Sequence, residues 1–252
     1  MIKLVVCDVD GTLLPPRDDS LDRSVIDGIG RLLNKGINVA IASGRSCSDL
    51  KSLFEPLSDE LYFICHDGAL CVKSGKVLYH KPILREDVSA FAANAKGSLG
   101  GILFSGADRA FSLGGGKAAE IFKINGSDAV EQISSVFEIK DPIYKISIYK
   151  DRADFADRFS GVRACSRSED WSEFVNRYAN KGTALSDLQM RLFATYFDTA
   201  VLGNAENDVC MLKNAKLGAC LPTAMPEYAS RTQMSFDSPA RFFDYIVSLR
   251  KD

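Results

Sequence analysis

The sequence has no long apolar run and almost no net charge. Over 252 residues, no apolar stretch approaches the roughly 18–20 residues needed to span a bilayer. The 31 basic residues against 33 acidic ones leave a formal charge of −2. The opening segment 1–14 carries aspartates where a signal peptide has small apolar residues. We therefore expect neither a membrane nor a nucleic acid as a partner.

Histidine and paired cysteines are also scarce. Only His66 and His80 are present, and none of the seven cysteines forms a C-x-x-C pair, which argues against zinc and against a disulfide framework. We expect free thiols in a reducing compartment, the cytoplasm. The glycines before Lys117 do not form a nucleotide-binding P-loop, because Phe111 replaces the first required glycine and Ala118 the required hydroxyl residue.

What remains is the composition of an ordinary globular protein. The chain is 46% apolar and 25% charged, which is typical of soluble domains. Its length fits one large domain or two smaller ones, with enough residues to bury a sizeable core.

Strands and helices alternate over the first 65 residues. The β-branched apolar run 2–7 is typical of a strand buried on both faces, and apolar residues at helical spacing predict a helix over 21–35, ending at Gly36. A strand over 37–42, a short helix over 49–54 and a strand over 61–65 follow. This alternation predicts an α/β fold with a doubly wound, mainly parallel, Rossmann-like sheet.

The pattern changes after about residue 72 and returns near residue 182. The intervening elements are a hairpin over 72–79, strands over 101–105, 109–113 and 144–149, and helices near 84–96, 128–137 and 151–160. The alternation in 145–149 predicts an antiparallel strand with one face exposed. Helices over 183–195, 207–214 and 239–250 then accompany strands over 198–203 and 217–221. We expect a core of residues 1–80 and 180–252 with an inserted α+β domain of residues 81–179.

Two carboxylates close the first predicted strand. Asp8 and Asp10 stand two residues apart and are followed by Gly11 and Thr12. Neighbouring carboxylates repel, so a cation normally joins them, and oxygen ligands of this kind suit Mg²⁺. A carboxylate can also attack phosphorus as a nucleophile. The alternative interpretation is an ordinary acidic turn after a strand. The apolar strand before Asp8 and the Gly11-Thr12 pair after Asp10 make this alternative the weaker one.

Three other polar segments lie at the ends of predicted elements, and the polar groups of segment 203–208 are expected at the same edge of the sheet as Asp8. Ser43-Gly44-Arg45 follows the second strand, Lys181 directly precedes a helix, and segment 203–208 follows an apolar strand. Taken alone, Ser43-Gly44-Arg45 fits a turn with a helix cap, Lys181 fits an ordinary surface charge, and segment 203–208 fits a loop with a helix cap. Because parallel strands end at one edge of a sheet, we expect Asp8, Ser43 and Asp67 to lie together there.

Together these segments resemble the haloacid dehalogenase superfamily of phosphotransferases. The opening Asp8-Val9-Asp10-Gly11-Thr12, then Ser43, Lys181 and Gly203-Asn204-Ala205-Glu206-Asn207-Asp208 occur in that family's order. The insertion between Ser43 and Lys181 is similar to a type II cap, above all that of the Cof-type (II B) sugar-phosphate phosphatases. The resemblance implies an Mg²⁺-dependent phosphatase acting on a small phosphorylated metabolite, above all a sugar phosphate.

The resemblance also implies a role for each motif residue. Asp8 would attack phosphorus and become an aspartyl phosphate, and Asp10 would protonate the leaving alkoxide and later activate water. Lys181 would offset the negative charge that gathers around Asp8. Phosphoryl oxygens and substrate would be bound by Ser43, Gly11, Gly44, Arg45, Asp67, Gly68 and Asn207. Mg²⁺ would be held by Asp8, the Asp10 carbonyl and Asn204, with Asp208 orienting ligands or water behind them.

Two positions depart from the family pattern. The metal box opens Gly203-Asn204 where the family has Gly-Asp, so one formal negative charge is missing and we expect weaker metal binding. Asp67 stands where the Cof-type proteins usually have asparagine. We expect this change to alter a substrate contact or to replace a structural hydrogen bond.

Two alternative functions stay open at this point. A phosphomutase of the same family shares the nucleophile and the acid/base, and differs in requiring a bisphosphate. A non-catalytic phosphometabolite-binding protein is the other alternative, with Asn204 having removed the metal. The complete set of Asp8, Asp10, Ser43 and Lys181 weighs against mere binding. No motif specifies the substrate or the oligomeric state.

Overall fold

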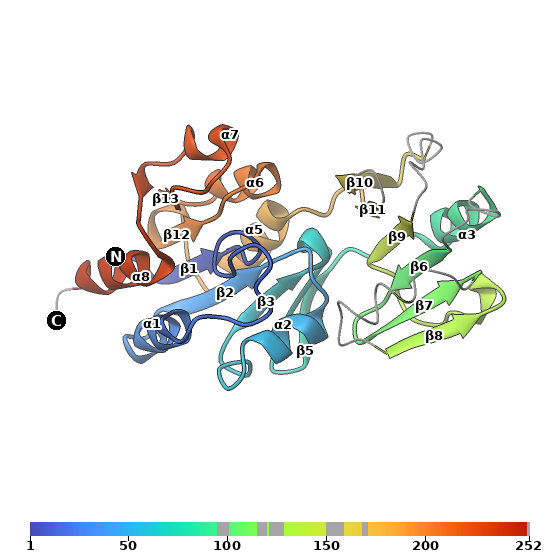
Figure 1. Ribbon diagram of the computed structural model, residues 1–252, viewed down its shortest axis with the longest axis horizontal. Coiled ribbons are helices and arrows are strands. Elements are labelled where there is room, and N and C mark those ends of the chain that lie inside the picture. The colour runs from blue at the N-terminus through green and yellow to red at the C-terminus, as the bar shows by residue number, and fades with distance from the viewer. Residues whose placement is uncertain (95–100, 115–119, 121–128, 150–158, 168–170, 251–252) are drawn as a thin grey trace. The chain divides into compact units, whose positions relative to one another are not determined.

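The chain forms two units, each built on its own sheet. The computed structural model describes residues 1–94, 101–114, 120, 129–149, 159–167 and 171–250 (Figure 1). By its internal contacts the chain divides into a core unit, residues 1–44, 50–79 and 180–252, and a cap unit, residues 80–179 with the short segment 45–49.

The core unit is organised by a largely parallel sheet. Among the described residues it has eight strands, in the order β14-β13-β12-β1-β2-β3-β4-β5. Their bounds are β1 Leu4–Cys7, β2 Asn38–Ala42, β3 Tyr62–Cys65, β4 Leu70–Lys73, β5 Lys76–His80, β12 Thr199–Leu202, β13 Leu217–Cys220 and β14 Met234–Ser235. Strands β14 to β3 run parallel, and β4 returns antiparallel to β3. Both β1 and β12 are buried throughout, as continuous apolar runs require.

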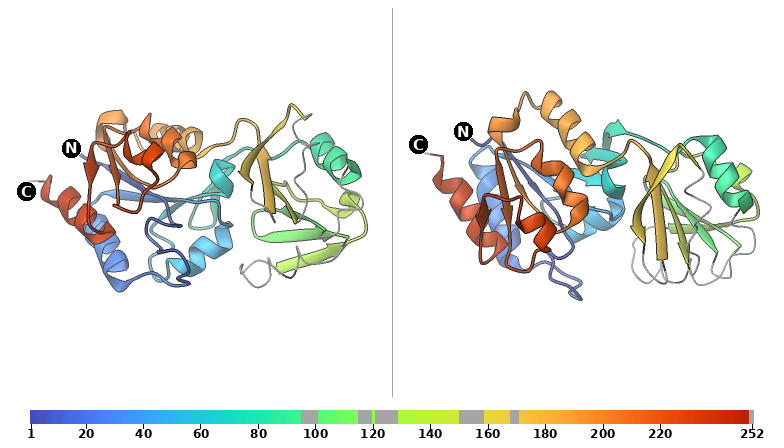
Figure 2. Two further views of the ribbon diagram at one scale, coloured as in Figure 1. Left: turned by 45° about the horizontal axis from the view of Figure 1, so that its top comes forward. Right: turned by 90° about the horizontal axis from the view of Figure 1, so that it is seen from above.

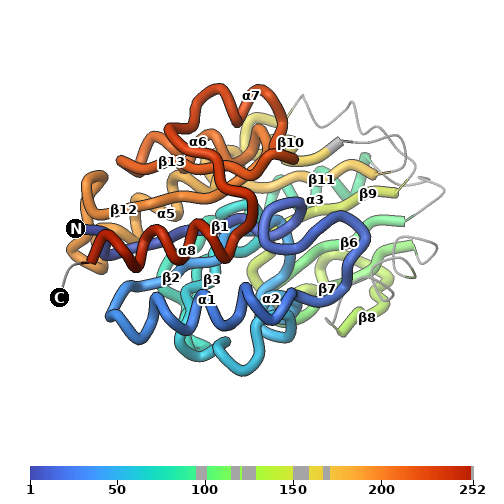
Figure 3. Tube along the Cα trace, turned by 60° about the vertical axis from the view of Figure 1, so that its left-hand side comes forward, coloured from blue at the N-terminus to red at the C-terminus, as the bar shows by residue number. Residues whose placement is uncertain are grey.

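Helices cover both faces of the core sheet (Figures 2 and 3). On one face α1 (Arg23–Asn34) lies beside α8 (Pro239–Ser248), so closely that a Cβ at Gly28 would come within 2.5 Å of Phe243. On the other, α5 (Lys181–Arg191) and α6 (Val209–Leu212) share an apolar cluster with β1, β2 and β3. The predicted doubly wound α/β class is confirmed.

Several short helical segments lie in the core unit, and α2 begins in the segment 45–49 that groups with the cap unit. These are α2 Cys47–Leu53, α7 Pro226–Ala229 and the 3₁₀ turns η1 His66–Gly68, η4 Tyr196–Asp198 and η5 Glu206–Asp208. Lys181, predicted to precede a helix, is instead the first residue of α5, which Asn180 caps. Within the described ranges, none of the helices is both long and apolar enough to cross a membrane.

The cap unit is organised by a mainly antiparallel sheet. In the part of the chain that is described, it has six strands in the order β10-β11-β9-β6-β7-β8. Their bounds are β6 Ile102–Ser105, β7 Arg109–Leu113, β8 Ala129–Ile133, β9 Lys145–Tyr149, β10 Val162–Arg167 and β11 Trp171–Asn176. All neighbouring strands are antiparallel except the parallel pair β7 and β8. Helix α3 (Arg85–Asn94) contributes Val88 and Phe91 to the apolar cluster of this unit.

The strand β9 confirms the predicted antiparallel pairing but not the predicted exposure. Ile146 and Ile148 belong to the apolar cluster, so the alternation does separate two faces of the sheet. The polar face is buried as well, because Lys145 is 6% exposed and Ser147 is 1% exposed. The alternation therefore marks two chemically different buried faces.

The helix predicted over 128–137 is wrong. Residues Ala129–Ile133 form β8, which pairs with β7, and a 3₁₀ turn, η2 (Val136–Glu138), follows. The apolar spacing of Val130, Ile133 and Phe137 fits a helix, but strand pairing overrides a weak local preference. Of the helices predicted over 84–96 and 151–160, residues 95–96 and 151–158 lie outside the described residues.

Candidate active site

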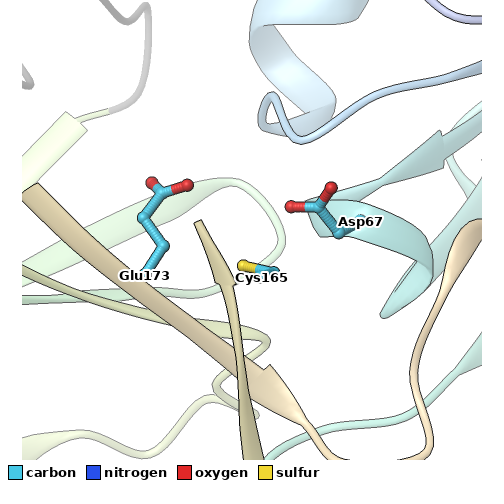
Figure 4. Close-up of side chains that lie close together, drawn as sticks. All are labelled: Asp67, Cys165 and Glu173. Atoms are coloured by element: carbon cyan, nitrogen blue, oxygen red, sulfur yellow. The ribbon is translucent and has the colours of Figure 1, made fainter. Parts of the chain in front are cut away.

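Polar residues of the core unit gather at the carboxyl ends of neighbouring strands. Asp8 directly follows β1, and Ser43 directly follows β2. Asp67, which is labelled in Figure 4, lies in η1 after β3. Asn204 follows β12 by two residues. Because β12, β1, β2 and β3 are adjacent and parallel, these positions share one edge of the sheet, as the sequence predicts.

A buried lysine joins two buried carboxylates at this edge. Lys181 Nζ lies 2.6 Å from Asp8 Oδ1 and 2.7 Å from Asp208 Oδ1. The second oxygen of Asp8 accepts a 2.9 Å hydrogen bond from the Thr12 hydroxyl. Lys181 is 1% exposed and Asp208 is fully buried. The array holds two negative charges and one positive charge when all three groups are ionised.

Burial dominates the electrostatics of this array. Loss of solvation raises the pKa of the Asp8 carboxyl to about 7, although the Lys181 ammonium acts in the opposite direction. For Lys181, burial works to lower the pKa, but Asp8 and Asp208 together hold it above its ordinary value. The ammonium is therefore charged at neutral pH, and Asp8 lacks enough positive charge nearby to stay fully ionised on its own.

Asp208 fixes the loop that follows β12. Its Oδ2 accepts hydrogen bonds from the backbone N–H of Asn204 at 3.0 Å and of Ala205 at 3.1 Å, while Oδ1 accepts from Lys181. A Cβ at Gly203 would lie 2.9 Å from the Asp208 side chain, so the close approach favours glycine. With both oxygens engaged, Asp208 is placed to orient Asn204 more directly than to bind a metal itself.

Asp10 stands at the exposed side of the cluster. Its carboxylate Oδ2 accepts a 3.4 Å hydrogen bond from the hydroxyl of the buried Ser43. The next residue, Gly11, has φ +80°, and a Cβ there would come within 2.2 Å of the Asn204 amide nitrogen. Both the backbone conformation and the lack of space therefore require glycine at this position.

Asn204 meets the Asp10 main chain with its amide nitrogen. The Nδ2 group donates a 3.1 Å hydrogen bond to the Asp10 carbonyl oxygen. An N–H donor is no metal ligand, so Asn204 has to turn its amide to present Oδ1 beside that carbonyl. After such a turn the available donors are a carboxylate, a carbonyl and an amide oxygen, and this set of hard oxygen atoms fits Mg²⁺.

Asp67 occupies a tight turn, η1. It has φ 53°, in the left-handed region that aspartate and asparagine tolerate better than most residues. Its Oδ1 accepts a 3.1 Å hydrogen bond from Asn207 Nδ2, and a Cβ at Gly44 would lie 3.1 Å from its Oδ2. Asp67 thus makes a structural hydrogen bond within the predicted substrate-binding set.

The turn at Gly68 lies against the beginning of α5. Gly68 has φ +91°, and a Cβ there would come within 2.2 Å of the Asn180 backbone. Because Lys181 is the next residue, this glycine sets how closely α5 approaches η1. Arg45, also predicted to bind substrate, falls in the segment 45–49, which groups with the cap unit.

Three supporting residues were absent from the predicted site. Thr12 holds Asp8, Asn180 caps α5 by accepting from Thr183 N at 2.8 Å, and Tyr228 Oη donates to the Ala219 carbonyl at 3.2 Å. Thr12 lies inside the recognised motif, and Asn-x-x-Thr is a capping pattern. Tyr228 has no local signal, because its position beside the loop after β12 depends on tertiary packing.

Comparison with known proteins places this geometry in a family. The model of the haloacid dehalogenase-like hydrolases matches residues 5–240. The chain belongs to this family. The predicted kinship is confirmed: it is a Cof-type haloacid dehalogenase-like phosphatase, a hydrolase of phosphoric monoesters.

Relatives match over almost the whole chain. It is 26% identical to phosphatase YwpJ of Bacillus subtilis, over 91% of this chain and 92% of the relative. It is 27% identical to the HMP-PP phosphatase of Escherichia fergusonii, over 90% of this chain and 86% of the relative. The solved structure of a haloacid dehalogenase-like hydrolase from Bacteroides thetaiotaomicron matches with a TM-score of 0.87 at 19% identity, covering 98% of this chain and 100% of that chain. This last likeness shows the shared fold.

Proposed function

We propose that this phosphatase hydrolyses a small phosphorylated metabolite, above all a sugar phosphate, through an aspartyl-phosphate intermediate and with the help of Mg²⁺. The observation that carries the proposal is the buried array of Asp8, Lys181 and Asp208, with its excess of negative charge. Burying these three charges adds little to the stability of the fold, because the cost of removing them from water offsets their attraction. The excess negative charge instead favours a bound cation beside a carboxylate that can act as a nucleophile. The names of the relatives, both phosphatases, agree with this reaction class.

Asp8 is the proposed nucleophile. Thr12 and Lys181 each hold one of its oxygens, so the carboxylate is fixed in direction before substrate arrives. One oxygen forms a bond to phosphorus while the bond from phosphorus to the leaving alkoxide breaks. Lys181 stabilises the negative charge that this step concentrates around Asp8.

Asp10 is the proposed acid and base. It gives its proton to the leaving alkoxide in the first step, and then takes a proton from the water that attacks the aspartyl phosphate. Inorganic phosphate leaves, and Asp8 is regenerated as a carboxylate. Ser43, which donates to Asp10, is proposed to bind a phosphoryl oxygen together with the backbone N–H groups near Gly11 and Gly44.

The proposed Mg²⁺ ligands are Asp8, the Asp10 carbonyl and the Asn204 amide oxygen, oriented by Asp208. When bound, the ion neutralises charge on the phosphoryl oxygens and on Asp8. For Asn204 this role requires the turn of its amide described above. We expect binding to be weaker than with an aspartate, because the amide carries no formal charge.

The remaining proposed roles concern the substrate and its location. Arg45, Asp67, Gly68 and Asn207 complete the set proposed to contact the substrate, and the inserted residues 81–179 are proposed to select it. We propose the cytoplasm as the compartment, since all seven cysteines are free thiols and thiols persist under reducing conditions.

Phosphate release from a panel of esters tests this proposal. Glucose 6-phosphate, ribose 5-phosphate and p-nitrophenyl phosphate are each offered to wild type, to Asp8→Asn and to the surface control Asp244→Asn, with Mg²⁺ or with chelator. Release that needs both Asp8 and Mg²⁺, and that survives Asp244→Asn, supports the proposal. Release that requires an added sugar bisphosphate indicates the mutase instead, and release by Asp8→Asn contradicts the mechanism.

A further inference from the structure

The first turn of α5 packs against the segment that carries Asp208. A Cβ at Gly182 would come within 2.4 Å of the Cys210 carbonyl oxygen, so α5 and α6 touch backbone to backbone at this point. Such a close approach requires glycine. Gly182 directly follows Lys181, the buried lysine that joins Asp8 and Asp208. The contact therefore lies one residue from a central group of the proposed active site.

Two side chains hold both main-chain polar groups of Gly182. The Gly182 N–H donates to Cys210 Sγ at 3.2 Å, and Asn214 Nδ2 donates to the Gly182 carbonyl oxygen at 3.1 Å. Cys210 lies in α6, and Asn214 follows that helix by two residues. The N–H groups in the first turn of a helix have no partner inside the helix, so the sulfur satisfies one of them. We call Cys210 and Asn214 the Gly182 clamp.

The Gly182 clamp is also bonded to the loop that ends at Asp208. Cys210 Sγ donates to the Asn207 carbonyl oxygen at 3.1 Å, and Asn207 immediately precedes Asp208. The same sulfur accepts from the Gly182 N–H. One thiol therefore ties the residue after Lys181 to the residue before Asp208, which are the two charged partners of the core array.

The stability of the helix end needs little of this arrangement. Asn180 already caps α5 by accepting from the Thr183 N–H at 2.8 Å. A thiol is a weak donor and a weak acceptor, so the bonds of Cys210 add little to the free energy of folding. What the Gly182 clamp fixes is the backbone just after Lys181. On the other side, the close approach of Gly68 fixes the backbone just before it.

We propose that Cys210 and Asn214 are positioning residues for the reaction, which act by holding Lys181 between Asp8 and Asp208. A lysine side chain is long and flexible, so the distances of 2.6 Å and 2.7 Å from Nζ to the two carboxylates depend on a fixed backbone. A displacement of about 1 Å in such a group can cost about 100-fold in rate. The inference rests on the proposed phosphatase function, in which Lys181 stabilises the charge that gathers at Asp8.

Variants of the Gly182 clamp test the inference. Asn214→Ala and Cys210→Ala each remove one side of the clamp, whereas Cys210→Ser keeps a donor and an acceptor at the same position. The control is Gln233→Ala, because Gln233 Oε1 accepts a 2.6 Å hydrogen bond from the Gly218 N–H in β13. That bond is of the same kind and in the same unit, but it holds a strand and not the start of α5. For each variant we measure Tm, and then kcat and KM with p-nitrophenyl phosphate and Mg²⁺ well below the lowest Tm.

The expected result is a loss of kcat without a loss of substrate binding. Asn214→Ala and Cys210→Ala lower kcat by about 10-fold and change KM by less than about 3-fold, because the weakened interaction is one made in the transition state. Cys210→Ser recovers most of the loss, and Gln233→Ala leaves both constants as in wild type. An unchanged kcat in both alanine variants, or a rise in KM as large as the fall in kcat, would overturn the inference.

A double-mutant cycle with Lys181 separates positioning from a general structural role. Lys181→Arg keeps the positive charge but replaces the compact ammonium that fits between the two carboxylates. In this background Asn214→Ala should lower kcat by less than about 2-fold, because no placed ammonium is left to be displaced. The same 10-fold loss in both backgrounds would mean that Asn214 does not act through Lys181, which contradicts the positioning role.

Nuclear magnetic resonance of the lysine side chains tests the Gly182 clamp without turnover. Lys181 is 1% exposed and bonded to two carboxylates, so its ammonium protons should exchange slowly enough to give a nitrogen-15 signal, which Lys181→Arg identifies by its loss. Asn214→Ala should broaden or remove this signal, and Gln233→Ala should leave it. Loss of the signal in Asn214→Ala, in a protein whose wild type releases no phosphate from any ester, would support the clamp and reject the hydrolysis. Asp8-dependent release, with a signal that neither Asn214→Ala nor Cys210→Ala changes, would do the reverse.

Discussion

The core and cap units both bury a lysine among carboxylates, but in different proportions. In the core unit Lys181 serves two carboxylates, Asp8 and Asp208, and burial raises the pKa of Asp8. In the cap unit Lys145 pairs with Glu173, which also accepts a hydrogen bond from the Ser147 hydroxyl. In the core unit one lysine is thus shared by two carboxylates, whereas the carboxylate of the cap unit has a lysine and a serine hydroxyl as its donors. The sharing in the core unit concentrates negative charge around Asp8.

Removing the nucleophile is the change with the largest expected effect. Asp8→Asn should lower phosphate release by about a thousandfold or more, as loss of a covalent catalyst does. The fold should persist, because an amide still fits between Thr12 and Lys181. Steady-state rates together with circular dichroism check this, and Asp244→Asn should behave as wild type. Substantial activity in Asp8→Asn would mean that the unequal charge in the core has no catalytic use.

Removing each lysine in turn tests the difference between the two units through its effect on the free energy of unfolding. Lys181→Met leaves two buried carboxylates without a cation and should cost about 3–5 kcal/mol of unfolding free energy. Lys145→Met removes the ammonium from Glu173, which is 20% exposed and still bonded to Ser147, and should cost about 1–2 kcal/mol. Urea unfolding of both variants at pH 7 measures the difference. An equal or larger loss in Lys145→Met would contradict the account.

The raised pKa of Asp8 predicts a pH effect on the metal-free protein. Because this pKa is higher in the folded chain than in the unfolded one, the neutral carboxyl favours folding. That contribution is present below about pH 4 and is lost as pH rises through about 7. In chelator, the Tm of Asp8→Asn should therefore exceed that of wild type by a margin that grows over this range. A margin independent of pH would show that Asp8 is ionised throughout.

A carboxylate at position 204 restores the negative charge that Asn204 lacks, and its expected effect on activity is smaller. Asn204→Asp should leave activity intact and lower the Mg²⁺ concentration for half-maximal rate by about 3- to 10-fold, because a carboxylate binds the ion more strongly than an amide. Direct Mg²⁺ titration by calorimetry gives the same comparison without turnover. An unchanged or higher Mg²⁺ requirement would mean that the metal ligand is misplaced.

The sequence predicted the core better than the cap for physical reasons. Strands such as β1 are buried on both faces, so their apolar runs are readable, and their ends placed Asp8 and Ser43 at one edge. In the cap, β8 carries apolar residues at a spacing that also fits a helix, and pairing with β7 decides the outcome. Local patterns are ambiguous wherever long-range pairing selects between structures.

The same contrast holds for side-chain partners. Lys145 and Glu173 meet because β9 and β11 are neighbours in one register, and nothing local to either residue predicts that meeting. The hydrogen bond from Asn204 Nδ2 to the Asp10 carbonyl likewise depends on how the loop after β12 is closed by Asp208. Motif spacing identified Asn204 as a position, whereas loop geometry decides which of its atoms faces the site.

The central claim is that Asp8 becomes phosphorylated during turnover. Asp10→Asn should trap this state, because an aryl leaving group needs no proton whereas hydrolysis of the intermediate needs the base. We would mix Asp10→Asn with p-nitrophenyl phosphate and Mg²⁺, quench in acid, and map the peptide containing residue 8 by mass spectrometry. The account predicts one added phosphoryl group on Asp8, absent in the double variant with Asp8→Asn. A burst of p-nitrophenol with an unmodified Asp8 would contradict it.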